Sequence, residues 1–467
     1  MQYPPGPRPQ RGRRPDVVVI GGGVAGLTAA VDLTSHGYSV FLIEQKEHCG
    51  GRTYSFVHDK TGDDVDNGQH LMMGCYHSTL RLLDTIGALP RVSVQKNLSV
   101  AFRHPQKGAA SLRASSLPAP LHLLFGLLRL KSLSLIQRIM LLRVGAALMY
   151  RTYDEEERLR SMTVSQWLDS LGQPEENKKY LWDILAIGTL NDSPSVVSAA
   201  LFAKVLRSAF LGTSSDSSMV IPRQGLSRIF VDSAVDYLTK HSGRVMLGKG
   251  VGALQVHDGL VNAVSLDDGE KMTPRAVISA VPYFGVTKML GEEMLRSFPE
   301  FRSLDAFRPS AIITIHLWFD IPFVDEEFVA LLDSPIHWVF NKSKILKGRK
   351  SGLSYLSLVV SGATELVEVK KAKLVEMAIS ELRKFYPESA KAKLVHSLVI
   401  KEKRATFSPR VGTEVIRPSH ITAVKNFFLA GDWTDTKLPA TIEGAVQSGY
   451  ACSELARKYL EDWKFTK

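Results

Sequence analysis

The chain has 467 residues and a formal net charge of +11, with 45% hydrophobic and 22% charged residues. This is the composition of a globular protein with apolar mass for two or three domain-sized cores, and it excludes a collagen-like or wholly disordered chain. The three cysteines, Cys49, Cys75 and Cys452, are too few and too scattered for a disulfide framework or a zinc site. We therefore expect a reducing compartment and no metal.

The N-terminal segment, residues 1–15, is rich in proline and arginine and has no apolar core. It lacks the hydrophobic region of a signal peptide, so we predict a disordered basic tail and a cytoplasmic location. No run of 18 apolar residues occurs anywhere in the sequence. We therefore expect no segment that spans a bilayer.

The first structured region reads as strand, tight turn, helix and strand. An apolar strand at Val17–Ile20 runs into Gly21-x-Gly23-x-x-Gly26, and a second strand at Ser39–Ile43 ends at Glu44. This order predicts a βαβ unit of a parallel sheet. In a dinucleotide site the first glycine makes the turn, the second admits a pyrophosphate, and the third lets helix and strand pack closely. The helix N-terminus would face the phosphates, and Glu44 would accept a ribose hydroxyl.

A second glycine turn, Gly50-Gly51-Arg52, follows six residues after Glu44. It resembles the glycine–arginine turn of flavoproteins of the amine oxidase and carotenoid desaturase group. Its backbone and its cation would add contacts to the phosphates of the cofactor. A simple nicotinamide dehydrogenase does not need such a turn, so this element favours FAD over NAD.

A basic, leucine-rich region follows. Residues 85–153 contain no Asp or Glu, and ten Lys or Arg residues lie among them. In the part from 117 to 150 the cations are spaced through Leu, Ile, Met and Phe, whereas nucleic-acid binders place theirs among polar and aromatic residues. We therefore expect no nucleic acid, and peripheral contact of segment 117–150 with the inner face of the membrane. The alternative is a pair of buried helices with cationic rims.

The middle of the chain is predicted to be helical at 165–172, 180–187 and 196–210. Strands return at 244–247, 251–256, 260–266 and 276–280, with hairpin turns at 257–259 and 267–269. Further strands at 311–319 and 353–360 predict a second β layer. A late strand reaches Gly431-Asp432, and a helix is expected from about Ala440. The amides at Thr441 and Ile442 would then open that helix.

Four strings of sequence together carry a closer family resemblance. They begin at Asp66, Leu117, Ser165 and Gly431 and read Asp-Asn-Gly-Gln-His, Leu-Pro-Ala-Pro-Leu-His, Ser-Gln-Trp-Leu and Gly-Asp-Trp-Thr-Asp-Thr-Lys-Leu-Pro-Ala-Thr-Ile-Glu-Gly-Ala. They are similar to those of bacterial hydroxysqualene dehydroxylases, the squalene-associated FAD-dependent desaturases of the amine oxidase superfamily. The similarity runs from about Val17 to Ser453, with Cys75 standing where a small residue is expected.

The resemblance implies an α/β fold: a Rossmann-like FAD-binding domain of the amine oxidase type and a discontinuous substrate domain of mixed β and helical structure. We assign residues 16–95, 216–290 and 420–467 to the FAD-binding domain, and 96–215 and 291–419 to the substrate and membrane-facing domain. Asp432 would meet the ribitol chain, and the following helix would direct its N-terminus at the flavin. The expected FAD-binding residues are Gly21, Gly23, Gly26, Glu44, Gly50, Gly51, Arg52, Val251, Gly431, Asp432, Thr441 and Ile442.

The resemblance also implies a reaction. Hydroxysqualene, an allylic C30 alcohol made by upstream hydroxysqualene-forming synthases, would lose its hydroxyl and receive a hydride from reduced FAD. The product would be squalene for hopanoid or other triterpenoid synthesis. Departure of the hydroxyl needs a proton donor.

His70, oriented by Asp66, is the candidate catalytic pair. The alternative, with equal weight, is that His70 is a loop-shaping histidine and Asp66 a helix cap. Tyr76 is a further candidate donor, although core packing is its commoner role. Glu443 would face either the flavin or a helix N-terminus. Tryptophans could line a polyprenyl tunnel, or simply pack in the core, at Trp167, Trp182, Trp318 and Trp338.

Three rival functions use the same motifs differently. A phytoene-type carotenoid desaturase transfers the hydride in the opposite direction, from substrate to FAD. An amine or protoporphyrinogen oxidase needs reactivity with oxygen, and usually a lysine beside the flavin or a covalent cysteine. A flavin-free prenyl-lipid escort protein predicts a degraded glycine turn, whereas all the glycines of both turns are present.

Overall fold

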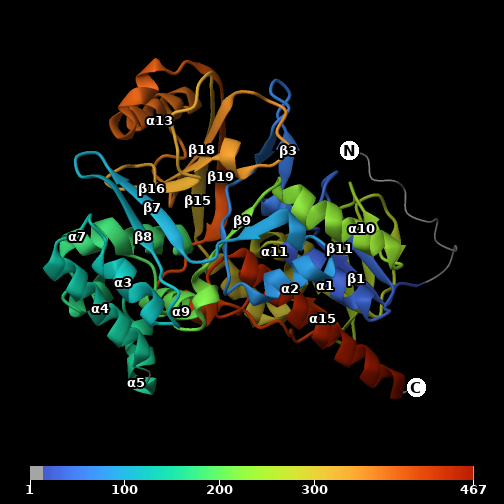
Figure 1. The fold of residues 1–467 in the computed structure, drawn as a ribbon. Helices are drawn as coiled ribbons and strands as arrows, with labels where there is room; N and C mark the ends of the chain where they lie inside the picture. Colours follow the sequence, from blue (N-terminus) through green and yellow to red (C-terminus); the bar gives the residue numbers. More distant parts are fainter. Residues whose placement is uncertain (1–13, 151, 466–467) are drawn as a thin grey trace.

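The computed structural model describes residues 14–150 and 152–465, so the predicted basic tail lies almost entirely outside the described residues. The predicted fold class is confirmed. A parallel sheet with its helices forms one part of the molecule, and a large mixed sheet with a group of helices beneath it forms the other (Figure 1). Within the described residues, no helix has the length and hydrophobicity to cross a bilayer.

The parallel sheet has five strands in the order β10, β2, β1, β14, β20. They are Arg244–Met246, Val40–Ile43, Val17–Ile20, Ala276–Ser279 and Phe427–Leu429. Both faces are covered, as the continuous apolar strand β1 requires. Val17 and Val19 pack with the helices α1 (Val24–Ser35) and α15 (Ile442–Phe465), whereas Val18 and Ile20 pack with the small sheet β11–β13.

That small sheet consists of β11 (Val251–His257), β12 (Leu260–Leu266) and β13 (Lys271–Met272), joined by the predicted hairpins. Short elements join the parallel sheet to the rest of the molecule. They are η1 (Gly51–Thr53), β3 (Ser55–Val57), β4 (Asp64–Asp66), β5 (Met72–Met73), α2 (His77–Thr85), β9 (Met219–Pro222), α10 (Ser233–Lys240) and α11 (Tyr283–Ser297).

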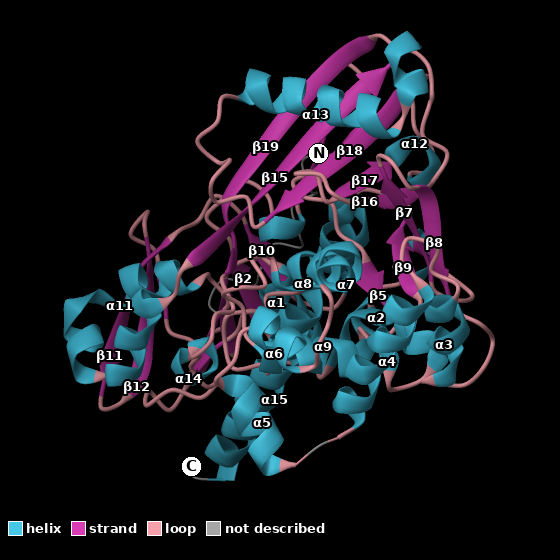
Figure 2. Cartoon of the chain, turned by 90° about the vertical axis from the view of Figure 1, so that its left-hand side faces the viewer, coloured by secondary structure: helices cyan, strands magenta, loops and turns pink. Residues whose placement is uncertain are grey.

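The second sheet has seven strands in the order β19, β15, β18, β17, β16, β7, β8. They are Leu394–Phe407, Pro309–Phe319, Ser354–Ser361, Trp338–Asn341, Phe328–Leu331, Ser99–His104 and Gly108–Arg113. Helix α13 (Lys371–Phe385) packs on one face of this sheet (Figure 2). The other face packs against the helical group in a shared hydrophobic core. The sheet therefore covers one side of the space between those helices.

The helical group includes the basic, leucine-rich region. Its main members are α3 (Leu121–Leu128), α4 (Leu135–Met149), α5 (Tyr153–Arg160), α6 (Val164–Ser170), α8 (Asp183–Leu190) and α9 (Ala199–Phe210). The basic, leucine-rich region forms the two helices α3 and α4, which carry exposed apolar side chains and so differ from the buried pair given as the alternative. Ser134 begins α4 with a capping box to Gln137, which explains why the helix starts there despite its hydrophobic surroundings.

Candidate active site

The two glycine turns meet at the carboxyl ends of β1 and β2. Gly23 and Gly50 form an isolated parallel bridge, and the Gly50 N–H donates to the Gly22 carbonyl at 2.8 Å. Gly50 has a φ of +113°, which a residue with a side chain rarely adopts. The structure therefore brings the two predicted phosphate-binding turns into one backbone surface.

Gly23 and Gly26 have different surroundings within the first turn. A Cβ on Gly26 would lie 2.0 Å from the Gly21 carbonyl oxygen, so this glycine lets α1 pack against β1. A Cβ on Gly23 would meet no atom within 4 Å and would project into open space at the N-terminus of α1. No side chain caps that helix end. Free helical N–H groups beside an open glycine form a cradle for a diphosphate.

Glu44, the predicted ribose acceptor, lines the same cavity and is nearly buried. Its carboxylate accepts the N–H of Gly22 at 2.8 Å and the N–H of Lys46 at 2.9 Å. It thereby holds the glycine turn as well as facing the cavity. Val251, at the start of β11, lines the cavity too, as predicted for a cofactor-binding residue.

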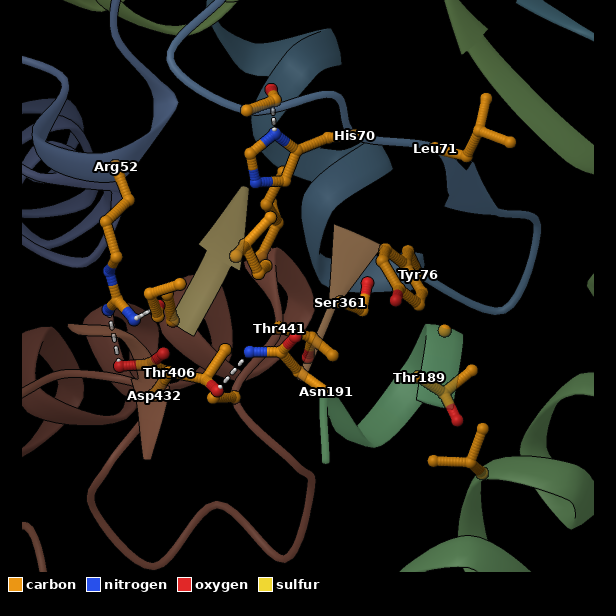
Figure 3. Close-up of a pocket in the computed structure, with 18 of the residues that line it drawn as sticks. Arg52, His70, Leu71, Tyr76, Thr189, Asn191, Ser361, Thr406, Asp432 and Thr441 are labelled. Carbon is orange, nitrogen blue, oxygen red and sulfur yellow. Dashed lines mark hydrogen bonds and ion pairs between the residues drawn. The ribbon is translucent and has the colours of Figure 1, made fainter. Parts of the chain in front are cut away.

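Arg52 joins the first and the last motif of the chain. Its guanidinium donates to Asp432 Oδ1 at 2.7 Å and to the carbonyl of Ala405 at 2.7 Å (Figure 3). Both Arg52 and Asp432 line the cavity, as does Gly431. Arg52 was predicted to contact phosphates, which stays a prediction; its protein partners are this carboxylate and this carbonyl.

Arg417 is a residue of this region that no sequence motif indicated. It is buried, it donates to the carbonyls of Asp432 at 2.9 Å and Leu438 at 2.6 Å, and it also binds the carbonyl of Thr434. Burial lowers the pKa of Arg417 to about 10, so it keeps its charge at neutral pH. Arg417 therefore fixes the loop that carries Asp432 to the cavity.

The N-terminus of α15 faces the cavity through Thr441 and Ile442. Thr441 Oγ1 accepts the N–H of Gly444 at 3.1 Å, which caps the helix. Glu443 turns away from this site. Its carboxylate accepts the N–H groups of Ser78 and Thr79 at 3.0 and 2.9 Å and so caps α2, which decides between the two roles expected for it.

His70 lines the cavity, and its Nδ1 donates to the Gly68 carbonyl at 2.8 Å (Figure 3). Because a carbonyl can only accept, the proton of the neutral ring lies on Nδ1 and Nε2 carries a lone pair. Burial lowers the pKa of His70, so the neutral ring is its form at pH 7. His70 can donate from Nε2 only after it is protonated.

The structure does not bring Asp66 and His70 into contact. The buried carboxylate of Asp66 pairs with Lys342 Nζ at 2.8 Å and accepts from Ser55 Oγ at 2.7 Å. Burial acts to raise the pKa of Asp66, but the Lys342 charge and the hydrogen bonds from Lys342, the Leu226 N–H and Ser55 together outweigh it, and the pKa is lowered. Lys342, which sequence reasoning missed, also binds Gln69 Oε1 at 2.7 Å. Lys342 and Asp66 thus position the loop that carries His70.

Tyr76 also lines the cavity, at the start of α2. Burial raises the pKa of its phenol, so Tyr76 keeps its proton at all moderate pH values. Tyr76 is therefore a second candidate proton donor of the cavity, with an O–H group where His70 has a ring nitrogen (Figure 3).

One continuous cavity of about 1180 Å³ is lined by the two glycine turns, Glu44, Arg52, Asp432, His70, Tyr76 and the start of α15. Its second part is almost wholly apolar and lies under the seven-stranded sheet. Residues lining that part are Leu123, Leu124 and Leu127 of α3, Leu141, Leu142 and Leu148 of α4, Ile184 and Leu185 of α8, and Leu206, Ala209 and Phe210 of α9. We call this part the apolar chamber. Small-molecule pockets commonly measure about 300–1,000 Å³, so the cavity exceeds what a single small ligand requires.

Two of the four tryptophans considered above line the chamber, namely Trp182 and Trp338. Trp167 is buried in the helical core, and Trp318 is buried against Tyr355, whose ring lies 4.4 Å away. The tunnel role therefore applies to two of them at most.

The polar end of the cavity fits FAD. An open glycine cradle at a helix N-terminus suits the diphosphate, and Glu44 is placed for a ribose. At the far side, the N-terminus of α15 reaches the cavity through Thr441 and Ile442, and its positive end would stabilise negative charge on a reduced flavin. These residues would hold the cofactor by backbone N–H groups and buried carboxylates.

Comparisons with known proteins agree with this interpretation. The model of the family described as flavin containing amine oxidoreductase matches residues 24–456. The chain is 26% identical to 15-cis-phytoene desaturase of Narcissus pseudonarcissus, over 96% of this chain and 80% of that protein. It is 27% identical to hydroxysqualene dehydroxylase of Rhodopseudomonas palustris, over 94% of this chain and 97% of that protein. A solved oxidoreductase from Methanosarcina mazei shares the fold, with a TM-score of 0.73 at 16% identity over 94% of this chain and 99% of that one.

Proposed function

We propose a specific reaction for this chain, which belongs to the family of flavin containing amine oxidoreductases and has FAD as its cofactor: the reduction of hydroxysqualene to squalene. The observation that carries the proposal is the single cavity, in which a flavin-type site opens directly into the apolar chamber. A chamber lined by leucines, isoleucine and phenylalanine suits a long hydrocarbon, because burying apolar surface is its main source of affinity.

The reaction balances as a reductive dehydroxylation. The allylic C–O bond breaks, the oxygen takes up a proton and leaves as water, and a C–H bond forms at the same carbon. Reduced FAD supplies the hydride and is left oxidised. The residues of the chain have the remaining tasks, which are to orient the alcohol, to supply the proton and to exclude water.

The relatives support an isoprenoid substrate. One is named as a hydroxysqualene dehydroxylase and the other as a phytoene desaturase, and both align with nearly the whole of this chain. Both names refer to long isoprenoids. The four sequence strings shared with the dehydroxylases favour that direction of hydride transfer, and a hydroxysqualene-forming synthase would supply the substrate.

The chamber would receive its substrate from a membrane surface. Four residues that line it are also exposed, namely Pro120, Leu121, Ala146 and Met149, and they mark a mouth between α3 and α4. On the same two helices, large apolar side chains face solvent: Ile136 is 72% exposed, Leu135 63%, Ile139 53% and Phe125 46%. Such a patch is unusual on a soluble monomer. We propose that it rests on the inner face of the membrane.

Two cations between the same pair of helices would face anionic lipid heads. Arg129 and Lys131 are exposed in the connection between α3 and α4. Arg138 has another role, because its guanidinium donates to the carbonyls of Leu133 at 2.8 Å and Leu128 at 2.9 Å. Arg138 therefore holds the turn between the two helices.

The test is a single turnover without oxygen. Chemically reduced holoenzyme is mixed with hydroxysqualene, and we expect squalene and reoxidised flavin in equal amounts. Oxidised enzyme given phytoene is the companion experiment. Reduction of the flavin by phytoene, with no squalene in the first experiment, would replace our proposal by desaturation. A purified protein that stays colourless after addition of FAD would favour a lipid escort instead.

A further inference from the structure

A hydrogen-bond chain ends at the junction of the flavin site and the apolar chamber. It begins at the Gly362 N–H, which donates to Asn191 Oδ1 at 2.8 Å. Asn191 Nδ2 in turn donates to Thr406 Oγ1 at 2.9 Å (Figure 3). The three residues come from the end of β18, the end of α8 and β19, so the chain ties together three elements that surround the chamber.

The donor and acceptor properties of the groups fix the direction of each hydrogen bond in this series. A backbone N–H can only donate, so the atom of Asn191 that faces Gly362 must be the oxygen, and the amide cannot be flipped. The atom facing Thr406 is then the amino group, which can only donate. The hydroxyl of Thr406 therefore acts as the acceptor in this contact, and its own proton must point elsewhere.

The direction that remains for the Thr406 hydroxyl proton is toward the cavity. Thr406 lines it, and within the described residues its hydroxyl has no acceptor. Asn191 lines it too, at the C-terminal end of α8, whose preceding turns form a wall of the chamber. The neighbouring Ala405 gives its carbonyl to Arg52 at 2.7 Å, which places Thr406 beside the flavin-binding motifs.

Other hydroxyl groups in the chamber lack this constraint. Thr189 also lines it, but its hydroxyl donates back to the Leu185 carbonyl at 2.7 Å and is satisfied within α8. Ser361 lines it as well, and no contact among residues 14–150 and 152–465 fixes its hydroxyl hydrogen. Thr406 is thus the residue whose donor is held toward the ligand.

We infer that Thr406, oriented by Asn191, is the donor that binds the oxygen of an isoprenoid alcohol, and that this contact makes the chamber prefer an alcohol over a hydrocarbon. The inference rests on the proposed function and deepens it. A hydrocarbon in the chamber would leave a desolvated O–H group without an acceptor, and sites built to bind a hydroxyl discriminate strongly against ligands that lack one. Thr406 would hold the carbinol oxygen, and protonation of that oxygen would fall to another group.

Binding can be measured without turnover, because oxidised enzyme has no hydride to transfer. Oxidised holoenzyme is titrated with hydroxysqualene and with squalene in the same detergent, and the change in flavin absorption gives each Kd. We expect wild type to bind hydroxysqualene more tightly. Thr406→Val should weaken that binding about tenfold and should tighten squalene binding, because it removes the O–H group that squalene leaves without an acceptor.

Three further variants separate this contact from general damage. Thr406→Ser keeps the hydroxyl and should keep the preference. Thr189→Val removes a hydroxyl from the same chamber that is already satisfied, and should change neither Kd. Asn191→Asp keeps the acceptor for Gly362 but replaces the donor with a carboxylate oxygen, which would draw the Thr406 proton out of the chamber and abolish the preference.

Several outcomes would overturn the inference. The first is equal binding of hydroxysqualene and squalene by wild type. The second is a preference that is lost in Ser361→Ala but kept in Thr406→Val. The third is a changed flavin content in Thr406→Val, which would mean that the Thr406 hydroxyl binds the flavin. These outcomes are independent of the reaction itself. If reduced enzyme makes no squalene while the preference still depends on Thr406, the proposed function fails and the inference stands.

Discussion

The two ends of the cavity are built in opposite ways. At the flavin end, backbone groups of glycine turns and helix N-termini form much of the surface, together with polar side chains such as Glu44, Arg52 and Asp432. At the other end, side chains of four helices form a chamber, and the backbone is covered. Hydrogen bonds stabilise the flavin end. For example, the Gly22 N–H donates to the Glu44 carboxylate at 2.8 Å.

This difference matches what we propose that each end binds. A diphosphate carries fixed negative charges, which are matched by N–H groups held in a rigid turn. A flexible hydrocarbon has no group that can form a hydrogen bond, so its binding depends on shape complementarity and on the apolar area that is buried. Each end has a glycine with open space beside it, Gly23 at the flavin end and Gly145 in the apolar chamber. A larger side chain at Gly23 should impair flavin binding, and one at Gly145 should impair only substrate binding.

Filling the flavin end should have the largest effect. Gly23 has φ and ψ of −71° and 175°, which a β-branched residue also adopts, and a Cβ there would meet nothing within 4 Å. We expect Gly23→Val to fold but to lose its flavin, and with it all activity. The ratio of flavin to protein absorbance and circular dichroism measure the two properties. Gly26→Ala is the contrast, since its Cβ would clash with the Gly21 carbonyl and should impair folding. A yellow Gly23→Val protein would contradict the assignment of the cradle.

The next largest effect concerns the proton donor at the boundary between the two ends. Burial lowers the pKa of His70, so the protonated ring becomes populated only as the pH falls below its ordinary value of about 6.5. If His70 is the acid, the single-turnover rate should rise as the pH falls through this range. His70→Gln should remove the rise and lower the rate by roughly 10²-fold. A flat profile that collapses instead in Tyr76→Phe would assign the proton to Tyr76.

Filling the apolar chamber should spare the flavin. Gly145 lies on α4 and lines the cavity, and a Cβ added to it would meet no atom within 4 Å. We expect Gly145→Leu to retain FAD and to lose about tenfold or more in turnover of the C30 substrate. Its unfolding free energy should rise by up to about 0.8 kcal/mol, because glycine is a poor helix former. Gly145→Ala should gain similar stability with little loss of turnover. Loss of flavin from Gly145→Leu would show that the two ends are not separable.

The exposed apolar side chains of α3 and α4 should show a smaller effect, on membrane binding alone. Ile136 is 72% exposed, and burying such a side chain in lipid is worth roughly 2 kcal/mol. Ile136→Ser should therefore weaken binding to lipid vesicles by about tenfold or more, with flavin content unchanged. Val415→Ser is the matched control: Val415 is 89% exposed on α14 (Thr413–Ile416), which lies far from α3 and α4 (Figure 2). Equal effects of both variants would remove the proposed docking face.

The cations between α3 and α4 should contribute least. Each cation near an anionic surface is worth about 1 kcal/mol. Arg129→Glu and Lys131→Glu should each weaken binding to anionic vesicles by roughly fivefold, and should have no effect on neutral vesicles. Arg138 is unsuitable for this test because it holds the turn between the helices. Binding that is indifferent to lipid charge would leave only the apolar contact.

Much of the flavin end could be predicted from sequence. The strand, turn and helix around Gly21–Gly26, the acid Glu44 and the turn Gly50–Arg52 were all expected, and the structure places them together. These features are readable because their residues are close in the chain and their geometry follows from local backbone preferences.

The roles of particular side chains could not be predicted. Asp66 was expected beside His70, but its partner is Lys342, 276 positions away. Glu443 caps α2, and Arg417 supports the loop of Asp432. No local pattern indicates these contacts, because a buried charge takes whichever partner the fold brings to it.

The amino-acid sequence by itself determined the flavin end of this protein, because a phosphate-binding turn is a short-range property of glycines, a strand and a helix. Only the tertiary structure decided the apolar chamber, its mouth between α3 and α4, and the donor at Thr406. Those features arise where helices and strands distant in the chain pack together, and the direction of a hydrogen bond between Asn191 and Thr406 exists only once that packing is complete.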